Sequence, residues 1–407
     1  MSEHDTRPQP PTEDPPMRRP SRLLSAIGVG AAVAASLLVI GPPPVADASG
    51  ACSNSGTGVR LPFATGSLGL PRGGSAQGPQ KPLPAFDNGR SRTVSWVTGP
   101  LSRNRTFTNF GISGTDVGVA WDNGRGQTLL AFGDTFGNCL HQGLGWRNNT
   151  LLRSTDRNLA DGLTLQRTGY AGPMFGALGF SGVEKTKIPT AGVSIGGRQY
   201  VNFMSVRAWG PPSVWYTNYS ATAVSSDNGR SWTTPQSTVR PNLPWNPIDS
   251  VFQQSAYVKG AGADAGWVYQ FGTPNGRFGN GYVARFRPSD VTNLGRYQYW
   301  TGSRWGGPGS RPAPVVRGHV TELSVQWSPV LRKYVMLDSP NGVRLRTAPH
   351  PEGPWSAGVR ITPPSLELYA PMMLPSSPAL RGTGPQLYFN ASRWDDYNVA
   401  LIETRIR

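Results

Sequence analysis

Cysteine, histidine and acidic residues are all scarce in this chain. The 407 residues include 2 cysteines, 4 histidines and 23 acidic residues, and charged residues make up 15% of the total. None of the histidines has the spacing of a zinc site, and the sequence contains no phosphate-binding loop and no calcium-binding loop motif. The sequence therefore predicts no metal site and no cofactor, and leaves open a structural cation inside the fold.

Lysine is also rare. Only 5 of the 39 basic residues are lysines, and the arginines are scattered, with no run longer than Arg18-Arg19. A nucleic-acid-binding protein more often shows a basic stripe or a recognised module. We interpret the net charge of +16 as a general attraction to an anionic envelope or polymer, and we expect no nucleic-acid partner.

Long apolar runs are missing from the sequence, with one exception near the N-terminus. Residues 23–40 are apolar, follow a basic stretch that ends at Arg22, and precede three prolines. The tripeptide Ala-Asp-Ala at 46–48 has the small-x-small form of a cleavage site. These features predict a secretory signal that is cleaved after Ala48. Retention of residues 23–41 as a single membrane anchor is the alternative, because the run is long enough to span a bilayer.

Composition divides the chain into three parts. Residues 1–48 are the N-terminal tail and signal, and residues 49–92 are a linker rich in glycine, proline and serine. The folded domain is expected over residues 93–407, as a monomer. The chain has two cysteines, Cys52 and Cys139. An even number of cysteines in an exported protein favours a disulfide bond, here between linker and domain; two free thiols are the alternative.

Glycine (51 residues) and proline (39 residues) are abundant, and long amphipathic helical patterns are scarce after residue 48. Short alternating runs, residues 163–167 and 319–327 among them, recur to the end of the chain in about five groups. One run leads into SSDNGRSW at 225–232, which matches the Asp box, a turn with a structural role in β proteins. At roughly 40–50 residues per group, the pattern predicts an all-β fold, a five-bladed β-propeller.

Residues 113–137 carry the clearest pattern. They read SGTDVGVAWDNGRGQTLLAFGDTFG, in which alternating runs at 115–121 and 128–136 flank an Asn-Gly turn. This pattern is typical of a β-hairpin. The hairpin would be symmetric about Arg125, so that paired residue numbers sum to 250.

This register places a small side chain opposite a large one at nearly every step. The pairs are Asp116–Asp134, Val117–Gly133, Gly118–Phe132, Val119–Ala131, Ala120–Leu130 and Trp121–Leu129. Direct partners have Cβ atoms roughly 4.5–5.5 Å apart, and like charges placed so are destabilising. A slip of one residue would instead put the two aspartates on opposite faces.

Two facing carboxyl groups are what the hydrolysis of a glycosidic bond requires. Asp116 and Asp134 are therefore the candidate catalytic residues; the alternative is that each makes a local hydrogen bond at a strand end. Asp134 is flanked on its face by Phe132 and Phe136, an apolar setting that should raise its pKa and suit it as general acid. Asp116, beside Gly118, is expected to be more open and to act as nucleophile or base.

Further polar and aromatic residues are candidates for substrate binding. Glu322 lies within the expected strand 319–327 between apolar neighbours, where an acidic residue is rare unless it is paired or functional. Glu184, in a loop, could be structural or functional. Tyrosine and tryptophan rings commonly hold sugars, and they also fill cores. The candidate substrate-binding residues are Phe136, Arg147, Asn148, Glu322, Trp394, Asp395 and Tyr397.

The segment GTDVGVAWDNGRGQTLLAFGDTFG resembles the hallmark of an actinobacterial family of endo-D-arabinanases that was long catalogued as a domain of unknown function. Four further segments agree in order: GWRNNTLLRSTD, ATAVSSDNGRSW, SDVTNLGRYQYWTG and RWDDYNVALIETRI. The resemblance covers roughly residues 95–407. Val117 stands where leucine is expected, and Asn148 stands where serine is usual.

This resemblance implies a five-bladed propeller hydrolase that cuts α-linked D-arabinofuranose chains of arabinogalactan and lipoarabinomannan. It places the two essential aspartates, in the TD and GDTF motifs, at Asp116 and Asp134. The expected partner is cell-wall arabinan, and the expected location is the cell envelope or the medium. Two alternatives stay open: an envelope propeller that binds glycan without cutting it, and a glycosidase acting on L-arabinan or sialosides. Whether the reaction retains or inverts the anomeric configuration is also open.

Overall fold

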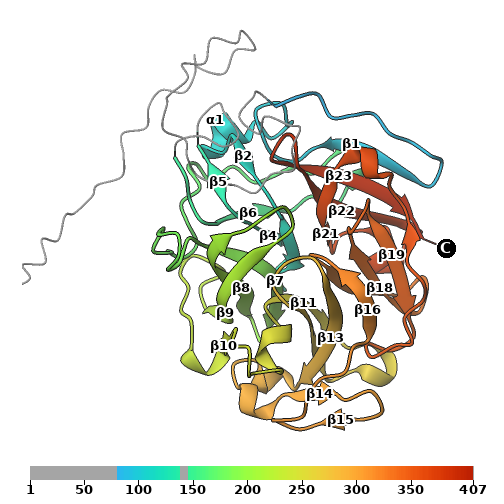
Figure 1. Ribbon diagram of the computed structural model, residues 1–407. Helices are drawn as coiled ribbons and strands as arrows, with labels where there is room; N and C mark the ends of the chain where they lie inside the picture. Colours follow the sequence, from blue (N-terminus) through green and yellow to red (C-terminus); the bar gives the residue numbers. More distant parts are fainter. Residues whose placement is uncertain (1–79, 138–144, 407) are drawn as a thin grey trace, which may run out of the picture. The chain divides into compact units, whose positions relative to one another are not determined.

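The computed structural model describes residues 80–137 and 145–406, and these residues form a five-bladed β-propeller, as the sequence predicts (Figure 1). The blades are antiparallel sheets. The first strands of successive blades contact one another in a closed ring. Closing a set of sheets into such a ring leaves only short, protected strand edges.

Blade 1 contains β3 (Val119–Asp122), β4 (Thr128–Phe132) and β6 (Thr150–Ser154), and β2 (Gly114–Thr115) pairs with β5 (Thr135–Phe136) in a separate ribbon. Blade 2 contains β7 (Thr186–Ile195), β8 (Arg198–Trp209), β9 (Trp215–Ser225) and β10 (Arg240–Pro241). Blade 3 contains β11 (Gln254–Lys259), β12 (Val268–Thr273), β13 (Gly279–Phe286), β14 (Gln298–Trp300) and β15 (Trp305–Gly306), and β16 (Val316–Val320) also pairs with β13.

Blade 4 contains β17 (Ser324–Ser328), β18 (Lys333–Asp338), β19 (Arg344–Ala348) and β20 (Val359–Arg360), and blade 5 contains β21 (Leu368–Met373), β22 (Gln386–Arg393), β23 (Asn398–Arg405) and β1 (Ser91–Trp96). The described α-helices are α1 (Thr106–Phe110) and α2 (Pro378–Arg381). The described 3-10 helices are η2 (Leu159–Asp161), η3 (Gln236–Thr238), η4 (Asp249–Val251), η5 (Gly262–Asp264), η6 (Pro288–Asp290), η7 (Leu294–Arg296) and η8 (Pro364–Leu366).

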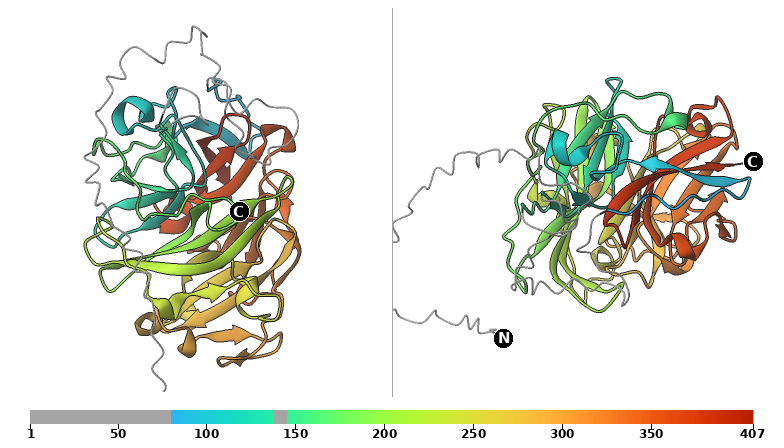
Figure 2. Two further views of the ribbon diagram at one scale, coloured as in Figure 1. Left: turned by 60° about the vertical axis from the view of Figure 1, so that its left-hand side comes forward. Right: turned by 90° about the horizontal axis from the view of Figure 1, so that it is seen from above.

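The ring closes between the two ends of the domain. Strand β1, the first of the described strands, is the outermost strand of the last blade, and it pairs with β23 from Ser91 opposite Thr404 to Trp96 opposite Ala400. Figure 2 shows the blue β1 alongside the red β23. Residues 80–90 lie against the same blade, because the Lys81 backbone N–H donates to Asp396 at 2.8 Å.

The hydrophobic core lies in layers between neighbouring blades rather than within one sheet. Phe132 of blade 1 and Leu401 of blade 5 belong to one such layer, and Trp121 of blade 1 and Val201 of blade 2 belong to the next. Similar layers lie between blades 2 and 3, 3 and 4, and 4 and 5. The packed layers fix the strand ends of all five blades, and hence the loops that carry the site.

The predicted hairpin register is confirmed for β3 and β4, where Val119 pairs with Ala131 and Trp121 with Leu129. The same register returns in the ribbon, where Thr115 pairs with Thr135. Between them the prediction of a continuous ladder is wrong. Val117 has a φ of 66° and Gly118 a φ of 71°, so the chain turns out of the strand at these residues.

Two further predicted strands differ from the structure. Residues 163–167 form no strand, although the Gln166 N–H donates to the Arg153 carbonyl at 2.8 Å. Residues 319–327 are not one strand, because β16 ends at Val320 and β17 begins at Ser324. Glu322 therefore lies in the connection between two blades, which removes it from the apolar alternation and directs it to the end of the ring.

The Asp box has the structural role that its sequence predicts. Oδ1 of Asp227 accepts hydrogen bonds from the backbone N–H groups of Arg230 and Ser231, both at 2.9 Å. The Ser225 hydroxyl accepts the Gly229 N–H at 2.7 Å, and the half-buried Trp232 packs against the core of blade 2. The box thus locks the turn after β9.

Several predictions fall outside the described residues. These are the signal and its cleavage site, the alternative anchor, most of the linker, and both Cys52 and Cys139. No helix in the described ranges is long and apolar enough to cross a membrane.

Candidate functional site

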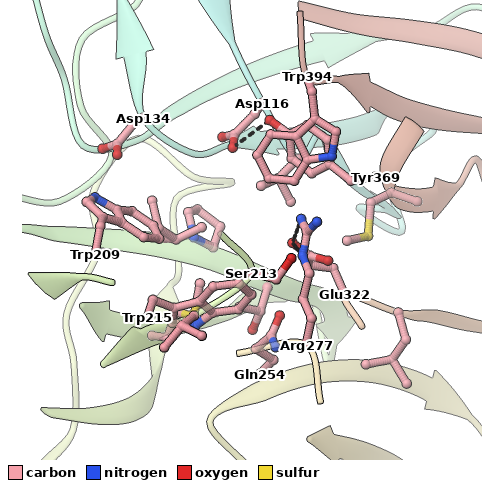
Figure 3. A pocket seen from close by; sticks show the side chains of 18 of the residues that line it. Asp116, Asp134, Trp209, Ser213, Trp215, Gln254, Arg277, Glu322, Tyr369 and Trp394 are labelled. Carbon is pink, nitrogen blue, oxygen red and sulfur yellow. Dashed lines mark hydrogen bonds and ion pairs between the residues drawn. The ribbon is translucent and has the colours of Figure 1, made fainter. Parts of the chain in front are cut away.

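A pocket opens at the end of the ring where the first strands of the blades begin (Figure 3). It contains about 870 Å³ of empty space, its open mouth included. Its lining comes from all five blades. The principal lining side chains are Asp116, Asp134, Thr190, Met204, Trp209, Trp215, Gln254, Arg277, Glu322, Tyr369, Trp394 and Tyr397.

Asp116 lies where the chain leaves the strand. The positive φ of Val117 is an uncommon conformation for a β-branched residue, and it is held by a hydrogen bond from the Val117 N–H to the Ser392 hydroxyl at 2.8 Å. The carboxyl group lies directly against Gly133, where a Cβ atom would be 2.3 Å from Asp116 Oδ1. The glycine is therefore required for this placement of the acid.

The two oxygens of Asp116 have different surroundings. Oδ2 accepts a hydrogen bond from the Tyr369 hydroxyl at 3.1 Å. Oδ1 is buried and receives no hydrogen bond of normal geometry from any described residue. Burial, followed by the nearby charge of Asp134, raises the pKa of Asp116 to about 8.

Asp134 lies at the corner between β4 and β5 and is buried. Its Oδ1 accepts hydrogen bonds from the Thr186 hydroxyl at 2.6 Å and from the Trp146 indole N–H at 2.9 Å. Burial raises the pKa of Asp134 to about 6, and these two donors together with Lys185 limit the rise. Asp134 is thus the acid that ionises more readily.

The expected order of the two acids is therefore wrong. Asp116 is the more exposed of the two, as expected, because it is half-buried whereas Asp134 is buried. Its pKa is nevertheless the higher one, because burial of the carboxyl group and the negative charges of Asp134 and Glu322 oppose its ionisation. Phe132, which was expected to make the surroundings of Asp134 apolar, belongs instead to the core layer between blades 1 and 5.

A third carboxyl group in the pocket belongs to Glu322. Arg277 donates to its Oε1 from Nη2 at 2.5 Å and from Nε at 3.2 Å, and Oε2 is buried without a partner in the described structure. The Arg277 guanidinium lies 4.4 Å from the ring centroid of Trp394. Stacking and pairing together hold this cation and anion in one orientation.

Aromatic rings form two sides of the pocket. Tyr369 and Trp394 stack with their centroids 4.0 Å apart and their planes at 21°. Trp209 and Trp215 lie on another side, at the two ends of the β8–β9 turn, and their indole N–H groups are buried and unpartnered among the described residues. Figure 3 shows both tryptophans across the pocket from Trp394, with Arg277 between Trp215 and Trp394 and both aspartates at one edge.

The structure brings together some of the predicted binding residues. Glu322, Trp394 and Tyr397 line the pocket with the two aspartates. Phe136 lies one layer away, with its ring centroid 5.6 Å from that of Tyr397.

The other three predicted binding residues also lie outside the lining. Arg147 donates to the carbonyls of Ala171 and Gly111 at 2.7 and 2.5 Å, and Asn148 donates to the Phe175 carbonyl at 2.9 Å. Both therefore fasten loops near the pocket. Asp395 forms an ion pair with the exposed Lys81 at 3.7 Å.

Sequence reasoning missed Arg277, Trp209, Trp215 and Tyr369. Each comes from a blade other than the Asp116 hairpin, and no local motif marks it. The one available signal is the tryptophan pair that flanks the Gly-Pro-Pro turn after β8. In the described ranges, no group of three or more histidine, cysteine or acidic side chains is placed to hold a metal ion.

The fold and the site define a class: a five-bladed propeller with two carboxyl groups of raised pKa in an aromatic-lined pocket at the end of its ring. The chain belongs to the family described as Domain of unknown function (DUF4185), which matches residues 101–403.

Individual relatives are more distant. Over 315 residues the chain is 27% identical to the Notoamide biosynthesis cluster protein J of Aspergillus sp. (strain MF297-2), covering 70% of this chain and 80% of that protein. It is similar to the crystal structure of a protein from Bacteroides ovatus ATCC 8483, with a TM-score of 0.52 and 14% identity over 79% of this chain and 93% of that one. It is also similar to the exo-beta-1,3-galactanase of Phanerochaete chrysosporium, with a TM-score of 0.48 and 11% identity over 78% and 64% of the two chains.

Proposed function

We propose that this protein is a glycoside hydrolase that uses Asp116 and Asp134 as its catalytic pair. One observation carries the proposal: two carboxyl groups with unequal surroundings line one pocket, and the first keeps a buried oxygen that the described protein does not satisfy. Paired acids with different pKa values are the requirement for protonating a leaving group on one side of a bond while a carboxylate acts on the other.

The pKa values assign the roles. Near neutral pH, Asp116, with a pKa of about 8, holds its proton and is the general acid that protonates the glycosidic oxygen. Asp134, with a pKa of about 6, is ionised and is the nucleophile or the base for water. Charge then develops on the sugar in an oxocarbenium-like transition state, which the Asp134 carboxylate stabilises.

Unsatisfied polar atoms in the pocket indicate the chemistry of the ligand. Oδ1 of the protonated Asp116 can donate its proton, Oε2 of Glu322 can accept a hydrogen bond, and the indole N–H groups of Trp209 and Trp215 can only donate. A buried polar atom without a partner is costly, so a ligand that satisfies all four gains affinity. Hydroxyl groups both donate and accept, and the C–H faces of a sugar fit the aromatic sides of the pocket.

We propose α-D-arabinofuranosyl linkages of arabinogalactan and lipoarabinomannan as the substrate, cut within the chain. The support is the resemblance of residues 114–137 to the endo-D-arabinanases, together with the acids and aromatic rings of the pocket. We propose the cell envelope as the location, on the basis of the apolar run at 23–40 and the cleavage motif at 46–48.

The test is incubation of the purified protein with arabinogalactan, L-arabinan and a sialylated glycan, with chromatography of the products. The expected result is a set of oligosaccharides of several lengths from arabinogalactan alone. Asp116→Asn and Asp134→Asn should each lower the rate by about 10²–10⁴-fold, because the amide keeps the shape and cannot carry charge or exchange the proton.

Other outcomes separate the alternatives. Products from L-arabinan or the sialylated glycan would replace the proposed specificity. Retention of arabinan without any cleavage would make the protein a glycan-binding propeller. Full activity in either asparagine variant would overturn the catalytic pair.

A further inference from the structure

Large exposed apolar side chains are concentrated on the loops at the pocket end of the ring. In the described part of the chain, those at this end lie in the β5–β6, β6–β7, β10–β11 and β12–β13 connections and at the start of β9. Five of the side chains lie on blades 1 and 2 or in the connection between these blades, and we call them the outer platform: Trp146, Leu178, Phe180, Val183 and Tyr216. Leu178 and Phe180 are 61% and 69% exposed, so they contribute little to the core.

The platform begins at a catalytic group. The Trp146 indole N–H donates to Asp134, and the far edge of the same ring lies beside Gly179, where a Cβ atom would be 3.7 Å from Cζ3. Gly179 in turn separates Leu178 from Phe180. Trp146 therefore links the Asp134 carboxyl group to the loop that carries Leu178 and Phe180.

The other end of the platform returns to the pocket. The Gly182 N–H donates to the Arg207 carbonyl at 2.8 Å, and the Arg207 guanidinium lies 5.7 Å from the ring centroid of Tyr216. Tyr216 packs against Gly210, where a Cβ atom would be 3.2 Å from its ring. Gly210 lines the pocket, so the platform is continuous with the pocket at both ends.

A buried acid holds this platform in place. Glu184 accepts from the Leu178 N–H at 3.2 Å and from the Ser205 hydroxyl at 2.8 Å. It also accepts from the Tyr219 hydroxyl at 3.2 Å and pairs with Lys187 at 3.4 Å. These contacts tie the loop to blade 2 while its apolar side chains face solvent. A surface fixed before a ligand arrives loses less entropy on binding.

We infer that the outer platform binds the part of the glycan chain that continues out of the pocket on the Asp134 side. The inference rests on the proposed function and extends it from one cleaved bond to a polymeric substrate. Aromatic and aliphatic side chains present flat apolar surface to the C–H faces of successive sugars, and an exposed apolar patch of this kind marks an interaction site. Continuity with the pocket favours the substrate itself as occupant over a lipid surface or a second protein.

The platform has a defined kinetic consequence. Binding of remote sugars is equal in the ground state and in the transition state, so its loss raises KM and leaves kcat unchanged. A short substrate that fills only the pocket does not reach the platform. The platform should therefore matter for the polymer and not for a small aryl arabinofuranoside.

The experiment compares the full-length double variant Leu178→Ser/Phe180→Ser with the matched control Val330→Ser/Val359→Ser. The control removes two exposed valines on blade 4, one in the β17–β18 turn and one in β20. The expected result is a KM for arabinogalactan raised about threefold to tenfold in the platform variant, with unchanged kcat and unchanged rates on the aryl glycoside. The control should match the wild type on both substrates.

Equal KM values in the platform variant and the wild type would overturn the inference and leave the proposed function intact. If the wild type cuts no arabinan, the proposed function fails. Affinity electrophoresis in gels containing arabinogalactan then tests separately whether the platform binds the glycan. Weaker retention of the platform variant than of the control supports the platform, and equal or absent retention overturns it. Platform-dependent sedimentation with anionic vesicles, or a platform-dependent dimer in size-exclusion chromatography, would replace the glycan with a lipid surface or a second copy.

Discussion

Two aspartates of this propeller, Asp116 in the pocket and Asp227 in the Asp box, both lie in short turns at strand ends and have opposite surroundings. Asp227 accepts hydrogen bonds on both oxygens, from the hydroxyls of Ser225 and Ser231 and from two backbone N–H groups. The bonds from Ser231 and Ser225 hold the pKa of Asp227 well below its ordinary value.

Asp116 accepts a hydrogen bond from the Tyr369 hydroxyl on Oδ2, and both Tyr369 and Tyr397 limit the rise of its pKa. Its buried Oδ1 has no hydrogen bond of normal geometry in the described structure. Its pKa is raised to about 8. The difference shows how one residue type serves two purposes. A carboxylate that the protein satisfies stabilises a turn, and one that the protein buries without partners is available to protonate or bind a ligand.

The largest expected difference between the two aspartates is the loss of activity when each is replaced. Asp116→Asn should lower kcat by about 10²–10⁴-fold, because the general acid is lost. Asp227→Asn should leave kcat within twofold of the wild type, since its turn lies outside the pocket lining. Rates of oligosaccharide release measure both. Similar losses in the two variants would mean that Asp116 acts through the fold.

The next effect tests the close contact behind Asp116. Gly133→Ala would place a methyl group 2.3 Å from Asp116 Oδ1 and force the acid to move. A displacement of about 1 Å costs about 10²-fold in rate. Gly172→Ala is the matched control, because nothing lies within 4 Å of a Cβ atom there. Equal rates in the two variants would contradict this account of Asp116 placement.

Replacement of the two aspartates should change the thermal stability at pH 8 in opposite directions. Because the pKa of Asp116 is raised from 3.8 to about 8, the folded state binds more protons than the unfolded state, and stability falls as pH rises through this range. Asp116→Asn should therefore raise Tm by about 2 °C or more at pH 8 and change it little at pH 3. Asp227→Asn should lower Tm at pH 8, since its ionised form is the stabilised one. Calorimetry at both pH values tests the signs, and a lower Tm for Asp116→Asn at pH 8 would refute the buried-acid account.

The smallest effect concerns Glu322. A general acid with a pKa of about 8 and a base with a pKa of about 6 predict a bell-shaped profile with its maximum between these values. The charge of Glu322 helps to raise the pKa of Asp116, so Glu322→Gln should move the alkaline limb to lower pH by less than about 1 unit. Glu352→Gln, outside the pocket lining, should leave the profile unchanged. An alkaline limb that moves upward in Glu322→Gln would contradict the coupling.

The sequence predicts well what depends on neighbours along the chain. The alternation on both sides of the Asn-Gly turn is sufficient for the register of Val119 with Ala131, and the spacing of strand groups is sufficient for five blades. The strand predicted at 163–167 fails because Leu163 and Leu165 are buried in the core layer without a strand ladder. The segment instead joins β6 through the bonds of Thr164 with Ser154 and of Gln166 with Arg153.

What depends on distant parts of the chain was not predictable. The order of the two pKa values depends on burial of Asp116 by the assembled ring and on the charge of Glu322, which lies in the connection between β16 and β17. Phe132 and Phe136, which flank Asp134 along the chain, instead predicted that Asp134 would have the higher pKa. Arg277 lies on blade 3, and only the folded ring brings its charge to Glu322.

Ring closure has a consequence for the order of events during synthesis. The bond from the Val117 N–H to the Ser392 hydroxyl joins residues 275 positions apart, and the Asn390 side chain reaches the Gly118 carbonyl across 272 positions. The corner that carries Asp116 is therefore fastened only after the last blade has been made and has paired with β1. Contacts of this sequence separation form late and slowly. A chain still emerging from the ribosome has no assembled pocket, so the hydrolytic activity proposed here begins only with the complete propeller.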